Sequence, residues 1–186
     1  MNVYTLRPDS DHYQAIELET DEAWDPFLDR FDGRAIGGAW WHPRIEILRE
    51  VPRDYDLLPG DFPSLGGIIP VFSQKAVSAL RDLLEENGEL LPLVCDEGEY
   101  FAYNVTRIVD ALDEKQSSVD RFATGNIMGI SRYHLQSTAL DSLTIFKLPQ
   151  SARVETYVTD TFVDRASKGG LVGFDFQRIW PPSSRE

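Results

Sequence analysis

The chain has 186 residues with 31 acidic and 18 basic side chains, which gives a formal net charge of −13 and a pI near 4.6. A protein surface with this excess of negative charge repels phosphate backbones and anionic lipids, so we expect neither a nucleic-acid partner nor a membrane partner. The same charge attracts a basic protein surface and speeds its encounter with the chain. With 42% hydrophobic residues, the chain can form a packed core.

The sequence predicts a cytoplasmic protein. Residues 1–9 lack the basic stretch and apolar run that are typical of a signal peptide. The longest apolar region, residues 65–72, is much shorter than the ~20 residues that a membrane span needs. The single cysteine, Cys95, excludes an internal disulfide and a cysteine-based zinc site.

Most of the excess negative charge lies in residues 9–32, which we call the acidic segment. It contains nine acidic residues and one basic residue, so it carries −8 of the net −13. Its acidic residues are Asp9, Asp11, Glu17, Glu19, Asp21, Glu22, Asp25, Asp29 and Asp32. Tyr13, Trp24, Phe27 and Phe31 are interleaved with them. Two interpretations stay open: the aromatics provide contact area on a protein-binding surface, or they turn into the core and leave an acidic face.

The N-terminal third predicts short, irregular elements. The candidate elements are strands over residues 3–6, 15–18 and 44–49 and a helix over residues 21–30. Residues 51–64 contain three prolines and predict a connector, because proline interrupts helices and strands. We therefore expect three parts: an irregular acidic N-terminal lobe at 1–60, an α+β core at 61–180 and a tail at 181–186.

A long helix is predicted over residues 73–87. Ser73 stands at the N-cap, where its hydroxyl can accept a hydrogen bond from a free helical amide. The apolar residues that follow at helical spacing are Ala76, Val77, Leu80, Leu83 and Leu84. Gly88 follows Asn87 and is expected to end the helix in a left-handed conformation.

The C-terminal half predicts further strands and a second, shorter helix. The candidate strands are residues 90–94, 99–104, 105–112, 125–135, 143–148, 155–158 and 171–179. Asp96-Glu97-Gly98 predicts a hairpin turn, and Thr159 is expected to cap a helix over about 160–168 that ends at Gly169. The predicted fold class is α+β, a mainly antiparallel sheet with one long helix (about 73–87) and one short helix.

Four stretches carry a resemblance to a known family. They are Asp61-Phe62-Pro63 with a glycine pair, Val71-Phe72-Ser73 opening the long helix, Tyr103-Asn104-Val105 continuing to Asp113, and Ile145-Phe146-Lys147-Leu148 continuing through Tyr157-Val158-Thr159 to Phe176. Over about residues 61–179 the chain resembles family eleven of the bacterial immunity proteins of polymorphic toxin systems, formerly a domain of unknown function. The resemblance implies a cytosolic antidote that binds a cognate toxin, and it implies no catalytic residues.

The residues with catalytic or metal-binding potential form no recognisable motif. His12, His42 and His134 have no metal-ligand spacing. Cys95 precedes Asp96 and Glu97, so we expect a poor nucleophile, because a reactive cysteine needs electropositive surroundings. No serine-hydrolase, Walker or dinucleotide-binding motif occurs. We expect no catalytic, cofactor-binding or metal-binding residues.

The unusual string Trp40-Trp41-His42 adds two candidates for partner binding. Adjacent side chains of a strand point to opposite faces, so one tryptophan could be exposed as a binding anchor, or both could be buried against different layers. The residues that we expect to bind the partner are Asp9, Asp11, Glu17, Glu19, Asp21, Glu22, Trp24, Asp25, Asp29, Trp40 and Trp41.

Three functions stay open at this stage. The leading one is an immunity protein that binds a cognate toxin with a basic surface. The second is a carboxylate-using enzyme or small-ligand-binding protein, for which a pocket with convergent acids and a perturbed carboxylate would be evidence. The third is a homo-oligomeric structural protein, and the sequence leaves the oligomeric state open. An acidic surface with exposed aromatics would favour the first.

Overall fold

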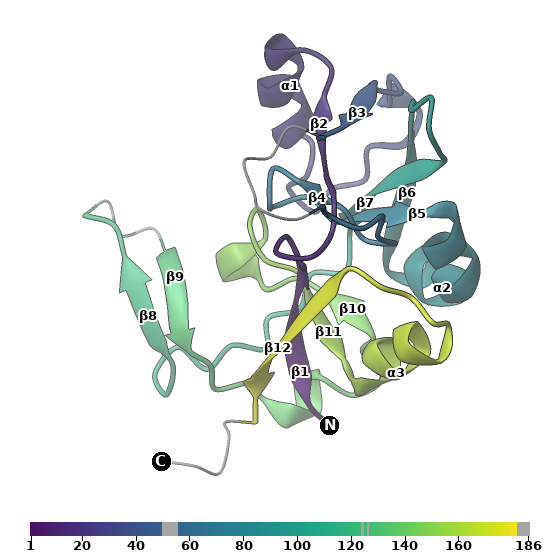
Figure 1. The fold of residues 1–186 in the computed structure, drawn as a ribbon. Helices are drawn as coiled ribbons and strands as arrows, with labels where there is room; N and C mark the ends of the chain where they lie inside the picture. Colours follow the sequence, from purple (N-terminus) through teal and green to yellow (C-terminus); the bar gives the residue numbers. More distant parts are fainter. Residues whose placement is uncertain (50–55, 124, 126, 182–186) are drawn as a thin grey trace.

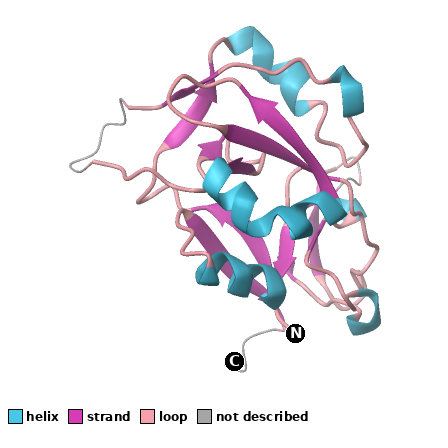
Figure 2. Cartoon of the chain, turned by 90° about the vertical axis from the view of Figure 1, so that its right-hand side faces the viewer, coloured by secondary structure: helices cyan, strands magenta, loops and turns pink. Residues whose placement is uncertain are grey.

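The computed structural model describes residues 1–49, 56–123, 125 and 127–181. In this part of the chain, three α-helices accompany several mostly antiparallel sheets, which confirms the predicted α+β class. Figure 1 shows the arrangement of the elements, and Figure 2 shows helices lying over one side of the strands. The predicted tail lies outside the described residues except for residue 181, and so do residues 51–55 of the predicted connector.

The largest sheet joins the two ends of the chain. Its strand order is β10-β11-β1-β12, and every pairing is antiparallel. Its strands are β1 (Val3–Pro8), β10 (Ile145–Phe146), β11 (Tyr157–Thr159) and β12 (Phe174–Trp180). The N-terminal strand β1 therefore lies between two C-terminal strands (Figure 1). The predicted boundary at residue 60 stays a prediction, and β1 is an element that crosses it.

A second sheet contains β5 (Val71–Ser73), β7 (Tyr100–Val105) and β6 (Gly88–Leu93) in that order. The long helix α2 (Gln74–Asn87) connects β5 directly to β6. The side-chain oxygen of Ser73 accepts a hydrogen bond from the backbone N–H of Ala76 at 3.2 Å, which confirms the predicted cap. The predicted apolar face is also confirmed, because all five of its residues are buried.

The end of α2 differs from the prediction. Gly88 has φ −179° and ψ −163°, so it is extended and already belongs to β6. A Cβ atom at Gly88 would lie 2.3 Å from the carbonyl oxygen of Asn104 on β7. Glycine stands here because another backbone approaches closely, and the expected left-handed turn is wrong.

Two expectations in the C-terminal half also need correction. Residues 105–112 do not form a strand, because β7 ends at Val105 and Ile108 makes only an isolated bridge. Helix α3 (Asp160–Lys168) begins where expected and is followed by Gly169. The Thr159 side chain makes no capping bond, and its hydroxyl donates instead to the carbonyl oxygen of Leu143 at 2.8 Å.

The acidic segment belongs to a third sheet and its covering helix. The strands are β2 (Ala15–Leu18), β3 (Ile45–Ile47) and β4 (Ser64–Leu65), with β2 antiparallel to β3 and parallel to β4. A 3-10 turn at Asp21–Ala23 leads into the short helix α1 (Trp24–Leu28), at the top of Figure 1. The remaining 3-10 turns are Gly37–Ala39, Ser137–Ala139 and Pro149–Ser151.

A two-stranded hairpin projects from the rest of the molecule. Its strands are β8 (Ser118–Arg121) and β9 (Ile127–Arg132), which pair antiparallel to each other. Figure 1 shows this hairpin at the left, away from the other sheets. Among the described residues, neither strand pairs with a third strand. The hairpin therefore presents two free backbone edges in this part of the structure.

Candidate partner-binding site

The acidic segment is fixed to the body by its aromatic residues. Phe27 and Phe31 are fully buried, with ring centroids 5.0 Å apart. They belong to one hydrophobic cluster with Trp40 and with Leu91 and Leu93 of β6. For these two phenylalanines the core interpretation is therefore correct, and they orient the segment so that its polar side faces outward.

The acidic side chains lie on the outside of the segment. Of the eight predicted acidic binding residues, seven are exposed and Asp9 is half-buried. Several of them have basic partners: Asp9 pairs with His12, Glu19 with Arg44 and Asp29 with Arg153.

Three exposed acids are arranged differently, and we call Asp21, Glu22 and Asp25 the acidic face. Asp21 and Glu22 lie in the 3-10 turn Asp21–Ala23, and Asp25 lies in the first turn of α1. Within the described part of the chain their carboxylates form no ion pair. Their charge is not neutralised locally and can act on an approaching molecule.

The two tryptophans lie beside the acidic segment. They follow the 3-10 turn Gly37–Ala39 and do not lie in a strand. Their side chains therefore do not point to opposite faces as predicted: the ring centroids are 4.9 Å apart and the rings are in contact. Trp40 is buried and its indole N–H donates to the carbonyl oxygen of Pro92 at 2.7 Å. Trp41 is 41% exposed, and the Arg30 guanidinium lies 5.5 Å from its ring centroid. Trp41 is therefore the accessible aromatic, while Trp24 is half-buried.

A partly buried hydrogen-bond network holds the loop that precedes these tryptophans. The carboxylate of Glu89 accepts hydrogen bonds from the backbone N–H groups of Ile36 and Gly37 at 2.7 and 2.9 Å. The Asn104 side-chain amide donates to Glu89 at 3.0 Å and to the carbonyl oxygen of Arg34 at 2.7 Å. Burial alone would raise the pKa of Glu89, but these hydrogen bonds outweigh it and lower that pKa. The charged carboxylate thus positions the tryptophan loop.

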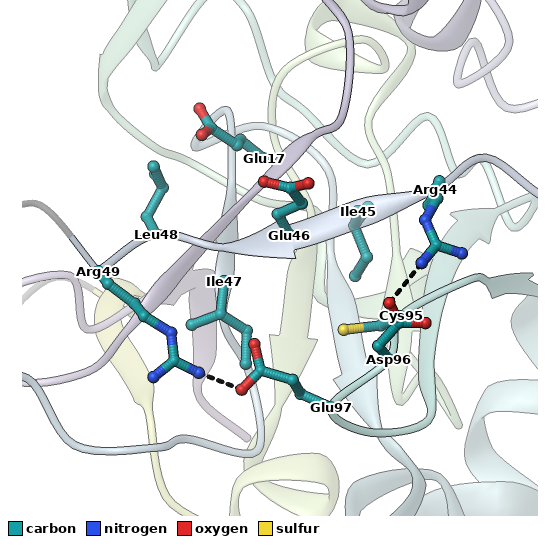
Figure 3. A pocket seen from close by; sticks show the side chains of 10 residues that line it. All are labelled: Glu17, Arg44, Ile45, Glu46, Ile47, Leu48, Arg49, Cys95, Asp96 and Glu97. Atoms are coloured by element: carbon teal, nitrogen blue, oxygen red, sulfur yellow. Dashed lines mark hydrogen bonds and ion pairs between the residues drawn. The ribbon is translucent and has the colours of Figure 1, made fainter.

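A cavity of about 440 Å³ lies beside β3 (Figure 3). Its lining residues are Glu17, Arg44, Ile45, Glu46, Ile47, Leu48, Arg49, Cys95, Asp96 and Glu97. Arg44 contacts Asp96 at 2.5 Å, and Arg49 pairs with Glu97. The hydrogen bond that Arg44 donates to the Asp96 carboxylate raises the pKa of Arg44. Two of the four carboxylates are therefore occupied by arginines, an arrangement that suits structural ion pairs better than proton transfer.

The other two carboxylates of this cavity are neighbours across the sheet. Glu17 and Glu46 are directly paired residues of β2 and β3, and both are exposed. Like charges opposite each other destabilise a sheet slightly, so this pair fits a solvated surface. Throughout the described ranges, no three His, Cys, Asp or Glu side chains are grouped as a metal site.

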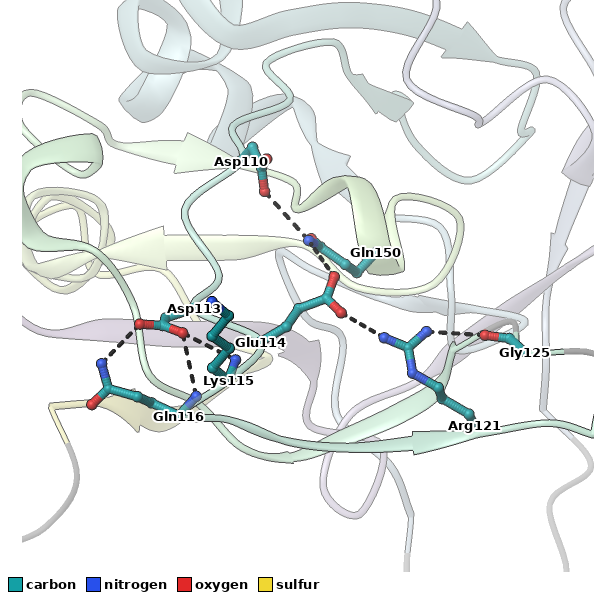
Figure 4. A network of polar contacts seen from close by, with 8 residues as sticks. All are labelled: Asp110, Asp113, Glu114, Lys115, Gln116, Arg121, Gly125 and Gln150. Carbon is teal, nitrogen blue, oxygen red and sulfur yellow. Dashed lines mark hydrogen bonds and ion pairs between the residues drawn. The ribbon is translucent and has the colours of Figure 1, made fainter.

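A second region was not predicted from the sequence. A cavity of about 750 Å³ lies between the β8–β9 hairpin and residues 149–154. Its polar wall is a network in which Glu114 accepts from Arg121 at 2.5 Å and from Gln150 at 3.2 Å (Figure 4). One feature of the sequence could have predicted this region: the run Ile127-Met128-Gly129-Ile130 is apolar on both faces of the predicted strand. A strand that is apolar on both faces is expected to pack against other parts of the chain on both sides, and a hairpin alone does not provide such packing.

A family model matches the C-terminal half of the chain. The model of the immunity protein family Imm11 matches residues 95–180. No curated protein is significantly similar to the chain. The matched range contains the hairpin, α3 and β12, and it excludes the acidic segment and the first two motifs of the predicted resemblance. In the described residues, no helix has the length and apolar character that crossing a bilayer requires.

Proposed function

Because residues 95–180 of this chain are an Imm11 immunity protein family domain, we propose that the protein binds a cognate bacterial toxin in the cytoplasm and neutralises it. The family implies a toxin partner. The observation that carries the proposal to particular residues is the acidic face, Asp21, Glu22 and Asp25, which is exposed. It lies in the same segment as Phe27 and Arg30, whose side chains contact the exposed Trp41.

The proposed mechanism has two steps. The unpaired carboxylates attract a basic toxin surface over a distance and raise the association rate. Trp41 then provides an exposed aromatic side chain, the residue type that most often dominates binding energy in interfaces. A toxin that acts on nucleic acid has a basic substrate site, so covering that site would block its activity.

The geometry supports an enzyme less well. The cavity in Figure 3 is the place where acidic side chains converge. Asp96 and Glu97 are each held by an arginine there. A general acid and base need free carboxylates within reach of a substrate, whereas here the pairing fixes the loop that follows β6 against β3.

The proposal is tested by co-expressing the chain with the product of the neighbouring open reading frame. We expect that product to stop growth when expressed alone, and we expect the chain to restore growth and to co-purify with it. The full chain is needed, because β11 and β12 of the matched range each pair with β1 and not with each other. A neighbouring product that is harmless, or that neither binds nor is neutralised, would contradict the proposal.

A further inference from the structure

Trp41 is an exposed tryptophan on a turn that is held on both sides. Trp40 and Pro43 lie close to it in sequence, and both are buried. The Trp40 indole N–H donates to the carbonyl oxygen of Pro92 at 2.7 Å, and the Pro43 carbonyl oxygen accepts from the backbone N–H of Val94 at 2.9 Å. The turn is thus fixed to the end of β6, and a partner that binds the Trp41 ring does not have to order it first.

Two aromatic rings of the core contact the Trp41 ring. The Trp40 ring lies at 4.9 Å between centroids with an interplanar angle of 43°, and the Phe27 ring lies at 6.3 Å and is nearly perpendicular to it. Trp41 nevertheless keeps 41% of its surface exposed. Tryptophan is highly buried on average, so an exposed indole on a fixed turn is a candidate anchor for another molecule.

In the free chain, the guanidinium of Arg30 lies against this ring. It is 5.5 Å from the ring centroid of Trp41, within the ~6 Å over which a cation is attracted to an aromatic face. Arg30 forms no ion pair with a described residue, because the nearby acids Asp29 and Asp32 pair with other arginines. The Trp41 ring therefore already holds a cationic side chain.

The charge around Trp41 favours a second cation from outside the chain. Phe27 and Arg30, which both contact the ring, belong to the acidic segment, and this segment carries −8 even with Arg30 included. Such a field draws basic groups toward it. Arg30 is exposed, and a cation–π contact is weaker in water than in a covered interface. A basic side chain that a partner buries against the ring therefore replaces Arg30 with a gain in free energy.

We infer that the Trp41 ring is a cation site for an arginine or lysine side chain of the toxin, and that Arg30 occupies this site until the toxin displaces it. The inference rests on the proposed function, because it names the group of the toxin that the exposed aromatic binds. Since Arg30 competes for the same ring, the affinity of the chain for the toxin is lowered by the fraction of time that the ring is occupied.

The test is a double-mutant cycle on the full chain, with the Kd for the neighbouring gene product as the readout. Arg30→Ala opens the ring, and we expect the Kd to decrease about threefold or more. Trp41→Leu removes the ring, and we expect the Kd to increase about tenfold or more. In the Trp41→Leu background, Arg30→Ala should have only the effect of its charge, because no ring is left to open.

Two further variants serve as controls. Arg34→Ala removes the same positive charge, and Arg34 is exposed and pairs with Asp32, so this variant measures the effect of charge alone. We expect it to change the Kd less than Arg30→Ala does, and by the same factor with or without Trp41. Trp41→Phe keeps an aromatic face that attracts cations less strongly, so its Kd should lie between those of the wild type and Trp41→Leu.

The outcomes separate the inference from the proposed function. If the unmodified chain forms no complex, the proposed function itself fails. If it binds and Trp41→Leu binds as tightly, the toxin does not use the ring and the inference alone is overturned. The inference is also overturned if Arg30→Ala weakens binding, if it acts no more strongly than Arg34→Ala, or if its effect is the same without Trp41. Because the Arg30 side chain is exposed, Arg30→Ala removes no core contact and gives an answer even if Trp41→Leu lowers stability.

Discussion

The buried ammonium group of Lys147 donates a hydrogen bond to the carbonyl oxygen of Ala152 at 2.6 Å. The same group lies 3.5 Å from the carbonyl oxygen of Phe31, at the end of the acidic segment. Lys147 is 3% exposed, and burial lowers its pKa to about 8 against the opposing effect of Asp32. One side chain thus joins the turn that follows Pro149–Ser151 to the segment that carries the acidic face.

Lys147 is expected to make the free energy of unfolding depend on pH. Its pKa is about 8 in the folded chain and 10.5 ordinarily, so the unfolded chain holds the proton more tightly. The cost of burying the charge is present below pH 8 and disappears as the pH rises to 10.5, so stability should rise in this window. The gap corresponds to about 3 kcal/mol at most.

Urea unfolding of the wild type and of Lys147→Met between pH 7 and 10 checks this prediction. We expect the stability of the wild type relative to the variant to increase with pH above 8. Burial raises the pKa of Tyr103 and of Tyr157, which lowers stability at high pH in both proteins and cancels in the difference. Parallel pH curves for the two proteins would contradict the assignment.

Asp61 is a buried polar centre whose removal should destabilise the fold. Its carboxylate accepts hydrogen bonds from the Ser73 hydroxyl at 2.9 Å, from the Lys75 ammonium at 2.9 Å and from the backbone N–H of Val172 at 3.0 Å. Asp61→Ala leaves these donors unpaired, so we expect a loss of about 2–4 kcal/mol in the free energy of unfolding. Asp164→Ala, at an exposed position, should change it by less than about 0.5 kcal/mol. Equal losses would show that Asp61 has no special role.

Gly88 should not tolerate even a methyl group. The added Cβ would meet the Asn104 carbonyl oxygen at 2.3 Å and force β6 and β7 apart, at a cost of about 1–3 kcal/mol. Thermal unfolding of Gly88→Ala measures this cost. The control is Gly38→Ala, since a Cβ at Gly38 meets no atom within 4 Å. A melting temperature for Gly88→Ala that equals that of the control would refute the close-approach explanation.

The features that the sequence predicted well depend on neighbouring residues. Helix α2 follows from its apolar spacing and from the Ser73 hydroxyl, both of which act within a few turns of the chain. The hairpin of β6 and β7 likewise follows from the turn at Asp96-Glu97-Gly98. The family resemblance depends on the same kind of local pattern, and the matched range of residues 95–180 covers its later motifs.

The features that were missed depend on residues far apart in the chain. The conformation of Gly88 is decided by Asn104 on another strand. The position of β1 is decided by β11 and β12, two strands near the other end of the chain. The cavity between the β8–β9 hairpin and residues 149–154 likewise needs two separate parts of the chain. The acidic segment could be recognised from its composition, but only the structure separates Asp21, Glu22 and Asp25 from acids that are paired.

The acidic face is central to the proposed function, and the association rate tests it most directly. The measurement is the rate constant for binding the neighbouring gene product at low and at high salt. In the variant, Asp21, Glu22 and Asp25 are all replaced by lysine. Because oppositely charged surfaces attract at long range, we expect this variant to associate at least about tenfold more slowly at low salt and to show a weaker dependence on salt.

The matched control reverses three other exposed acids and so has the same net charge. These are Glu86, Asp141 and Asp164, all outside the acidic segment. If the acidic face directs binding, this control should associate at a rate much closer to that of the wild type than the acidic-face variant does. An unchanged rate for the acidic-face variant, or an equal loss in both variants, would contradict the account.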